Sequence, residues 1–341
     1  MVNTLWFLVL AGMLTTYAVL DGFDLGVGVL HLLIARTPED RATAIGAIGP
    51  VWNGNEVWLI AAGGSMVVAF PHLYAAAFSG FYLALMLVLW LLVLRGIGIE
   101  FRHQVDNLLW REAWDVTFSL SSVLLAVLFG AAVGNVLRGV PLDFEGNFQG
   151  SFVLLLNPFA LLCGVLSVVT LAMHGASYLA LKTTGALQTR ARRATVVLWA
   201  GTLALLVLVA ASSFVVQPQF TANFSRWPFL VLVPLLGLAA AGAIPFFARR
   251  ERDGMTFVST GALIVGVLGS AAAGLYPRLL PALPGSSSAA LDIHNSASGH
   301  YSMKVALVMY LVGIAIVLGY LVKVYWVWRG KVTSEHGYRL P

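Results

Sequence analysis

The chain has 341 residues, of which 59% are hydrophobic and 10% charged, and its formal net charge is +5 at pH 7. A soluble globular domain is usually about one quarter charged, so this composition excludes that class and indicates a polytopic membrane protein. In such a protein excess lysine and arginine mark cytoplasmic loops, and the positive charge does not indicate a nucleic-acid partner. The single cysteine, Cys163, lies in an apolar run and is expected to be a small buried hydrophobe.

Nine apolar segments are long enough to cross a bilayer, which takes about 20 residues of helix. They cover about 4–30, 53–70, 74–95, 116–137, 152–181, 195–216, 228–247, 256–276 and 302–326. The sequence therefore predicts an all-α integral membrane protein. The opening MVNTLWFLVLAGM has no positive n-region and no small-residue cleavage site, so it predicts a retained helix and not a signal peptide.

The distribution of basic residues supports this count. Most arginines and lysines follow the first, third, fifth, seventh and ninth segments, whereas the alternate connections hold only Arg138, Arg226, Arg278 and Lys304. By the positive-inside rule, the N-terminus lies outside and the C-terminus lies in the cytoplasm.

A weak internal similarity suggests a duplication. AVLDGFDLGVGVL at 18–30 resembles LAMHGASYLALKT at 171–183, and both lie near the end of a segment that runs from outside to inside. One membrane domain would then contain four-helix units at 1–150 and 151–300, with a ninth helix and a cytoplasmic tail at 301–341. Membrane helices resemble one another by composition, so chance similarity is an equal alternative.

Two acids stand inside the first segment, in YAVLDGFDLGVGVLHLL. An ionisable residue at the centre of a membrane helix costs about 2.5–3.5 kcal/mol by insertion scales, so it usually has a partner. Asp21 and Asp24 are three residues apart and share one helix face, and the nearby glycines allow another backbone to approach. Two interpretations stay open: a tight helix crossing whose acids pair with a base, or a polar path.

The stretch GPVWNGNEVWLIAAGG, at 49–64, places an acid at the mouth of the second segment. Asn53, Asn55 and Glu56 lie between Trp52 and Trp58. Burial disfavours the charged form of a carboxyl group, which would let Glu56 exchange protons near neutral pH. The tryptophans are equally consistent with anchors at the membrane interface.

The connection from 95 to 115 is rich in charges, most of which are expected to be solvated. Arg95 and Asp115 abut the apolar segments and are the expected partners of buried charges such as Asp24. Of the seven histidines, only His174 is clearly inside a segment, so no metal site is predicted.

Six motifs resemble, in order and spacing, the cytochrome bd quinol oxidase subunit II family. They are DGFDLGVG, GPVWNGNEVWLIAAGG, FPHLYAAAFSGFYLALML, RGIGIEFR, LNPFALLCGVLSVVTLAMHGASYLALKT and the pair YPRLLP and SSSAALDIHNSAS. The resemblance extends from about Tyr17 to the last segment. It implies two four-helix bundles plus one peripheral helix, in the bacterial cytoplasmic membrane.

The resemblance also implies a partner and an activity. In that family subunit I carries two b-type haems, one d-type haem and the site of quinol oxidation, and subunit II carries no haem. The complex oxidises quinol and reduces dioxygen to water, building a proton motive force without pumping. Subunit II supports subunit I and lines a proton channel, and in some members it holds a quinone or lipid, contributes to an oxygen route, or is joined by small single-helix subunits.

The sequence departs from the family at one position of interest. The family motif WDGN holds the channel acid, whereas this chain has WNGN with Asn53 at that place. Our hypothesis is that Glu56, one turn further, replaces the aspartate. The alternatives are that Asn53 acts with water, or that protons enter mainly through subunit I. We further predict a buried Asp24–Arg95 ion pair, and a role for Trp58 either near the small-molecule path or in packing.

Two other functions compete with an oxidase subunit. A secondary transporter of a small solute would also have repeats and buried acids, but it would show broken helices at matching places in both halves. The glycines around Gly22 have only a poor match near Gly175, which argues mildly against it. A membrane scaffold without chemistry is the third alternative.

Overall fold

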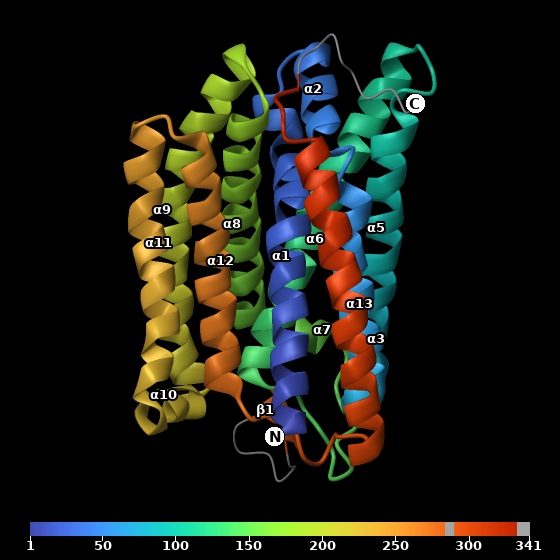
Figure 1. The fold of residues 1–341 in the computed structure, drawn as a ribbon, viewed down its shortest axis with the longest axis vertical. Coiled ribbons are helices and arrows are strands. Elements are labelled where there is room, and N and C mark those ends of the chain that lie inside the picture. The colour runs from blue at the N-terminus through green and yellow to red at the C-terminus, as the bar shows by residue number, and fades with distance from the viewer. Residues whose placement is uncertain (284–289, 333–341) are drawn as a thin grey trace.

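The computed structural model describes residues 1–283 and 290–332 and is a bundle of long helices (Figure 1). Within these residues, eight helices are long and apolar enough to cross a membrane. They are α1 (Val2–Ile34), α5 (Tyr82–Phe101), α6 (Leu108–Arg138), α8 (Pro158–Lys182), α9 (Gly185–Val216), α11 (Leu232–Arg249, preceded by a 3-10 turn at Pro228–Val231), α12 (Asp253–Leu275) and α13 (His300–Val327).

The second expected segment, 53–70, is the one that is missing from these eight, and it forms α3 (Trp52–Ala69), an 18-residue helix that lies alongside the others (Figure 1). At 1.5 Å per residue such a helix is about 27 Å long, close to the thickness of the hydrocarbon core. The prediction of an all-helical membrane protein with about nine long helices is therefore confirmed.

The third segment differs from its expected range. The helix that was expected from 74 is divided at Phe81: its beginning belongs to α4 (Pro71–Gly80), which Pro71 starts, and α5 begins only at Tyr82. Proline favours the first position of a helix, since its missing N–H has no partner there in any case.

Several short elements connect the long helices. The helix α2 (Pro38–Ile48) begins with a capping box in which Thr37 Oγ1 accepts from the backbone N–H of Asp40, at 3.1 Å. The remaining elements are α7 (Phe152–Leu155), α10 (Ala222–Arg226), a 3-10 turn at Pro218–Thr221, and the antiparallel strands β1 (Arg278–Leu280) and β2 (Leu291–Asp292).

The two ends of the bundle differ in character. The N-terminus and β1 lie at one end, whereas α2 and the end of α13 lie at the other (Figure 1). The two loops expected outside meet at the first end, where Val140 forms a bridge with Ala282. The arginine-rich connections follow α1, α5, α8 and α11 at the opposite end, which is the predicted cytoplasmic end.

Four helices pack together at the centre: α1, α6, α8 and α12. A Cβ atom added to Gly26 of α1 would lie 1.8 Å from the backbone oxygen of Leu171, and one added to Gly175 of α8 would lie 2.3 Å from the carbonyl carbon of Gly26. Small residues are required where two backbones touch in this way. The tight helix crossing that the glycines of the first segment suggested is therefore present.

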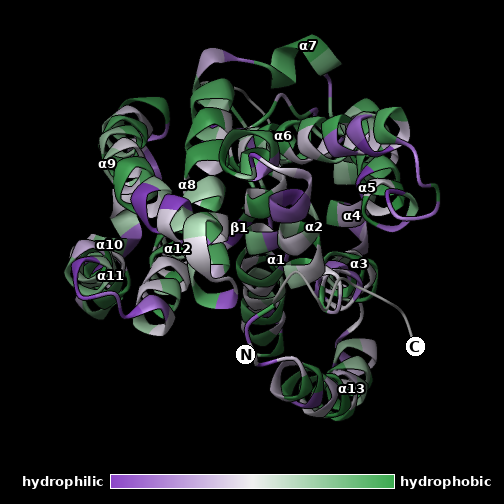
Figure 2. Ribbon diagram, turned by 90° about the horizontal axis from the view of Figure 1, so that it is seen from above, coloured by the Kyte–Doolittle hydropathy of each residue, from purple (hydrophilic) through white to green (hydrophobic). Residues whose placement is uncertain are grey.

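The last helix, α13, lies at the periphery against α1 and α3 (Figure 2). It is fastened near both ends. At one end Trp6 Nε1 donates to the backbone oxygen of Met303 at 3.0 Å. At the other end Lys182 Nζ donates to the backbone oxygens of Trp328 and Gly330, the latter at 2.8 Å.

Candidate functional site

An ion triad lies between α1, α3 and α5. The guanidinium of Arg95 donates to both carboxylate oxygens of Asp21, at 3.0 and 2.7 Å, and it also donates to Oε1 of Glu56. Arg95 and Asp21 are fully buried, whereas the side chain of Glu56 is 21% exposed. One cation therefore neutralises two carboxylates, of which only Glu56 reaches the surface of the subunit.

A second polar group is adjacent to the triad. Asn55 Nδ2 donates to Asp24 Oδ2 at 2.8 Å and to the backbone oxygen of Leu20 at 3.1 Å. Tyr325 of α13 donates its hydroxyl proton to Asn55 Oδ1 at 2.9 Å. Asp24 is completely buried, and its Oδ1 has no hydrogen-bond partner among the described residues.

This arrangement corrects the predicted Asp24–Arg95 ion pair. Arg95 binds Asp21 and Glu56, and in the described part of the chain Asp24 makes no ion pair. Residues three apart on a helix differ by about 60° in direction, so both acids share a face but only one points at α5. The other points at α3, where Asn55 is its neighbour.

The remaining residues of the WNGN stretch are spread around α3. Asn53 is exposed at the start of the helix, on the side away from Asn55. Trp52 packs against Gly96, where an added Cβ would lie 3.1 Å from the indole ring. Asn55 and Glu56 thus belong to the polar groups around Asp24 and Arg95, whereas Asn53 is exposed at the first turn of α3.

A third polar cluster lies nearer the predicted cytoplasmic end, around Asp115 of α6. Its carboxylate accepts from Arg102 Nε at 2.6 Å and from Arg41 at 3.3 Å, and it lies 2.7 Å from His31 Nε2. Asp115 is buried, and its partners are these residues and not Asp24. Arg102, expected in a solvated loop, is only 3% exposed because it binds this carboxylate.

These groups follow one face of α1. Asp21, Asp24, Gly28 and His31 are spaced by three, four and three residues, so they form a stripe along the helix. Gly28 lies against Ser122, whose Oγ would be 2.0 Å from an added Cβ. Sequence reasoning missed His31, although helical periodicity could have included it. No local signal connects Tyr325 to this site, because it comes from the far end of the chain.

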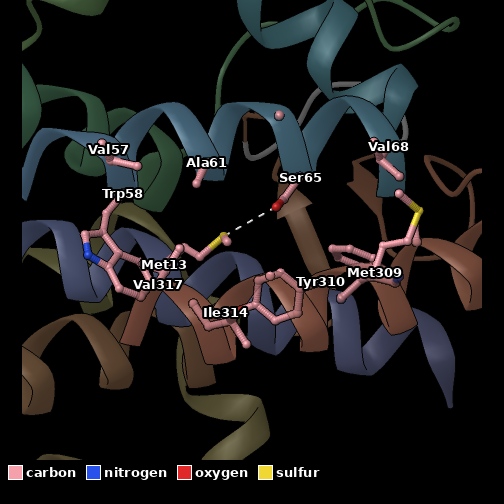
Figure 3. Close-up of a pocket in the computed structure, with 14 residues that line it drawn as sticks. Met13, Val57, Trp58, Ala61, Ser65, Val68, Met309, Tyr310, Ile314 and Val317 are labelled. Carbon is pink, nitrogen blue, oxygen red and sulfur yellow. Dashed lines mark hydrogen bonds between the residues drawn. The ribbon is translucent and has the colours of Figure 1, made fainter. Parts of the chain in front are cut away.

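An apolar pocket lies beside the polar groups, between α1, α3 and α13 (Figure 3). Its volume is about 480 Å³. Trp58 is buried at one end of it, and Tyr310 and Ile314 of α13 form the opposite wall (Figure 3). Within its lining, Ser65 Oγ donates to the sulfur of Met13 at 3.4 Å (Figure 3). Trp58 thus lines a pocket, whereas Trp52 packs on α5.

The histidine inside α8 has both ring nitrogens engaged. His174 Nδ1 lies 2.8 Å from Thr260 Oγ1, and Nε2 lies 3.0 Å from the backbone oxygen of Val19. Its ring stacks on Phe257. Neither nitrogen is free to ligate a haem iron, and among residues 1–283 and 290–332 no group of three or more His, Cys, Asp or Glu is placed to hold a metal ion.

Comparison with known proteins gives a consistent result. The model of the family described as cytochrome bd terminal oxidase subunit II matches residues 2–328. The chain is 35% identical to a probable cytochrome oxidase subunit 2 of Haemophilus influenzae and 32% identical to cytochrome bd-I ubiquinol oxidase subunit 2 of Escherichia coli K12, covering 97% of this chain and 95% of each relative. It is 32% identical to cytochrome bd ubiquinol oxidase subunit 2 of Bacillus subtilis, over 98% of this chain and 97% of that protein.

The fold is similar to that of a solved structure as well. The bd oxidase from Geobacillus thermodenitrificans contains a chain that matches with a TM-score of 0.79, at 18% identity, over 96% of this chain and 98% of that one. At this identity the match supports the fold and not the roles of single residues.

Proposed function

Because this multi-pass membrane protein belongs to the cytochrome bd terminal oxidase subunit II family, we propose that it is the haem-free subunit of a quinol-oxidising, dioxygen-reducing complex. A haem-bearing subunit I, with two b-type haems and one d-type haem, would carry the redox chemistry. Such a complex builds a proton motive force without pumping, because it takes the protons for water from the cytoplasm and releases quinol protons outside. The engaged nitrogens of His174 support a haem-free role for this chain.

The observation that carries a proton path is a group of three neighbouring carboxylates, two of them bound to Arg95 and the third, Asp24, held by Asn55. Glu56 is partly exposed and bound to Arg95, and Asn53 stands one turn before it at the entrance of α3. Asp24 lies deeper, without a cation partner in the described part of the chain. A buried carboxylate without a countercharge is costly, so taking up a proton at Oδ1 relieves that cost.

The path runs from the cytoplasmic entrance to the interior. Asn55 orients the Asp24 carboxylate, which takes up the proton inside this chain, and Glu56, whose edge is exposed, passes it towards subunit I. This keeps the hypothesis that Glu56 replaces the acid absent at Asn53, and it adds Asp24 as a buried acceptor before it. The competing alternatives are that Asn53 and water suffice, or that protons enter through subunit I.

The test compares Glu56→Gln and Asp24→Asn in the purified complex with Glu112→Gln, an exposed acid of α6. Haem content reports assembly, and oxygen reduction and proton uptake report function. We expect both cluster variants to assemble but to lose most proton uptake, with the Glu112 variant unchanged. Normal uptake and turnover in both cluster variants would exclude this path.

The exposed edge of Glu56 also indicates where subunit I docks. On the same helix Val57 is 45% and Ile60 74% exposed, and on α5 Trp90 is 62% exposed. A carboxylate among such residues at membrane depth needs protein or water beside it and not lipid tails. We assign this α3–α5 face to subunit I.

Cross-linking tests the assignment in a Cys163→Ala background, since Cys163 is the only cysteine of the chain. Ile60→Cys should cross-link to subunit I. Val207→Cys on α9, which is 67% exposed, should not. The reverse pattern would place subunit I on the other side of the bundle.

The apolar pocket is a candidate site for a quinone or lipid tail, or a passage for dioxygen, with Trp58 as its inner wall. Gly64 lines it, and no atom lies within 4 Å of a Cβ added there, so Gly64→Leu directs a side chain into the pocket from an open position. Gly12→Leu, at another open position of α1, is the control. We expect the Gly64 variant to lose bound quinone or lipid in mass spectra, or to raise the KM for oxygen. If both quantities match those of the control, the pocket has neither role.

A further inference from the structure

A second hollow lies at the predicted cytoplasmic end, between α9 and α11. These two helices lie on the side of the bundle away from α13 (Figure 2). Its volume is about 440 Å³, within the usual range of about 300–1,000 Å³ for small-ligand sites. It is lined by Trp199, Gly242, Pro245, Phe246, Arg249 and Arg250.

A hydrogen bond between α9 and α11 holds one side of this hollow, and Pro245 leaves its acceptor free. Proline has no N–H, so it cannot bond the carbonyl oxygen of Ala241 one turn earlier in α11. Trp199 of α9 donates its Nε1 proton to that oxygen at 2.8 Å. The indole therefore joins the two helices and fixes one side of the hollow.

The arginines at the hollow have no acidic partner in the described part of the chain. The two acids of the following connection are both occupied by Arg192, which donates to Glu251 at 2.6 Å and to both oxygens of Asp253 at 2.8 Å. Arg249 and Arg250 are exposed, and the guanidinium of Arg250 lies 3.8 Å above the ring of Phe246. This end therefore holds two uncompensated positive charges next to an apolar surface.

An apolar stripe leads from the arginines towards the centre of the membrane. Leu238, Gly242, Phe246 and Arg250 follow one another at four-residue spacing, so they share one face of α11. Leu238 is 62% and Phe246 48% exposed. Gly242 leaves a notch between them, with no atom within 4 Å of an added Cβ.

We propose that this hollow binds an anionic phospholipid, with its phosphodiester at Arg249 and Arg250 and an acyl chain along the stripe through the Gly242 notch. Basic pockets between membrane helices on the cytoplasmic side attract anionic headgroups, and arginine pairs well with phosphate oxygens. The continuous apolar stripe favours a lipid over free phosphate, because phosphate has no apolar group that could pack against it.

The first test measures lipid binding by the complete purified complex, using phosphatidylglycerol and, for comparison, phosphatidylcholine. A basic residue near an anionic membrane surface adds about 1 kcal/mol to the binding free energy. Removing both charges in Arg249→Gln/Arg250→Gln should therefore lower the affinity for phosphatidylglycerol about 30-fold. Arg249→Lys/Arg250→Lys, which keeps the charges, should retain most of it. Arg226→Gln, at the other end of the bundle, is the control for removing a charge. Equal phosphatidylglycerol retention in the Gln double variant and the wild type, by native mass spectrometry, would overturn the proposal.

The second test separates the lipid from a free anion. Gly242→Leu fills the notch without changing any charge, so it should weaken phosphatidylglycerol binding while the arginines remain. Inorganic phosphate should not raise the thermal midpoint of the wild-type complex, whereas phosphatidylglycerol should. If phosphate protects as well as the lipid and Gly242→Leu has no effect on either, the site binds a free anion and the lipid assignment is wrong.

Discussion

Both oxygens of the Asp21 carboxylate accept hydrogen bonds from the guanidinium of Arg95, so residues 74 positions apart form one buried pair. Removing one partner of such a pair leaves the other charge uncompensated, which costs about 3–5 kcal/mol. We expect Asp21→Asn to lower the thermal midpoint of the complex and the yield of assembled haem. Glu56→Gln keeps the pair and should cost clearly less. An equal decrease of the thermal midpoint and haem yield in the two variants would show that the Asp21–Arg95 pair contributes no more to stability than the Glu56–Arg95 contact.

The hydroxyl of Tyr325 provides the second prediction. Tyr325→Phe leaves Asn55 Oδ1, which is buried, without its donor, at a cost of about 1–3 kcal/mol. Tyr320→Phe removes a hydroxyl from a residue of α13 that is 59% exposed and should change stability by less than about 0.5 kcal/mol. The free energies of unfolding of the two variants, compared in the same detergent, measure the contribution of the Tyr325–Asn55 hydrogen bond. Identical values would mean that the hydrogen bond contributes nothing.

Two glycines of α1 should respond in opposite directions to the same substitution. Gly26→Ala forces a methyl group into the backbone of α8 and should destabilise the protein by at least about 1–3 kcal/mol. Gly12 has open space around it, so Gly12→Ala should be neutral or slightly stabilising, because alanine favours helix more than glycine does. Thermal unfolding of each variant measures the difference. A tolerated Gly26→Ala would refute the close crossing.

The cluster around Asp115 predicts that the same substitution will affect stability very differently at Asp115 and at the nearby Asp106. Asp115→Asn removes the charge that Arg102 and Arg41 share, and since Asp115 is only 1% exposed we expect a loss of about 3–5 kcal/mol. Asp106 pairs with Arg111 at the surface and is 95% exposed, so Asp106→Asn should have no measurable effect. Limited proteolysis of the α5–α6 connection offers a second readout, because Arg102 anchors it. Unchanged cleavage in Asp115→Asn would contradict this role.

The sequence was sufficient for the nine helical segments and for the identity of most polar site residues. Long apolar runs have few alternatives in a membrane, so their number follows from hydropathy, and buried charges are rare enough to stand out. Which of those charges pair with one another could not be predicted from the sequence. Asp21 and Asp24 differ by only about 60° around α1, and which of them reaches Arg95 depends on how α3 and α5 are turned.

Other features required the tertiary structure for the same kind of reason. The start of α4 could have been predicted from Pro71, but the sequence contains no comparable signal for the break at Phe81 that divides the third segment. The contact of Tyr325 with Asn55 joins residues 270 positions apart, and the sequence contains no signal for it.

The attachment of α13 has a mechanical consequence. Trp6 holds its first turn, and Tyr325 and Lys182 hold its last turns, whereas the stretch between them meets the bundle through apolar side chains such as Ile314 and Val317. Among the described residues, no side-chain hydrogen bond joins this middle stretch to α1 or α3. We therefore expect the middle of α13 to be the part of the pocket wall that yields most easily to a bulky ligand, while the hydrogen bonds at its two ends stay in place.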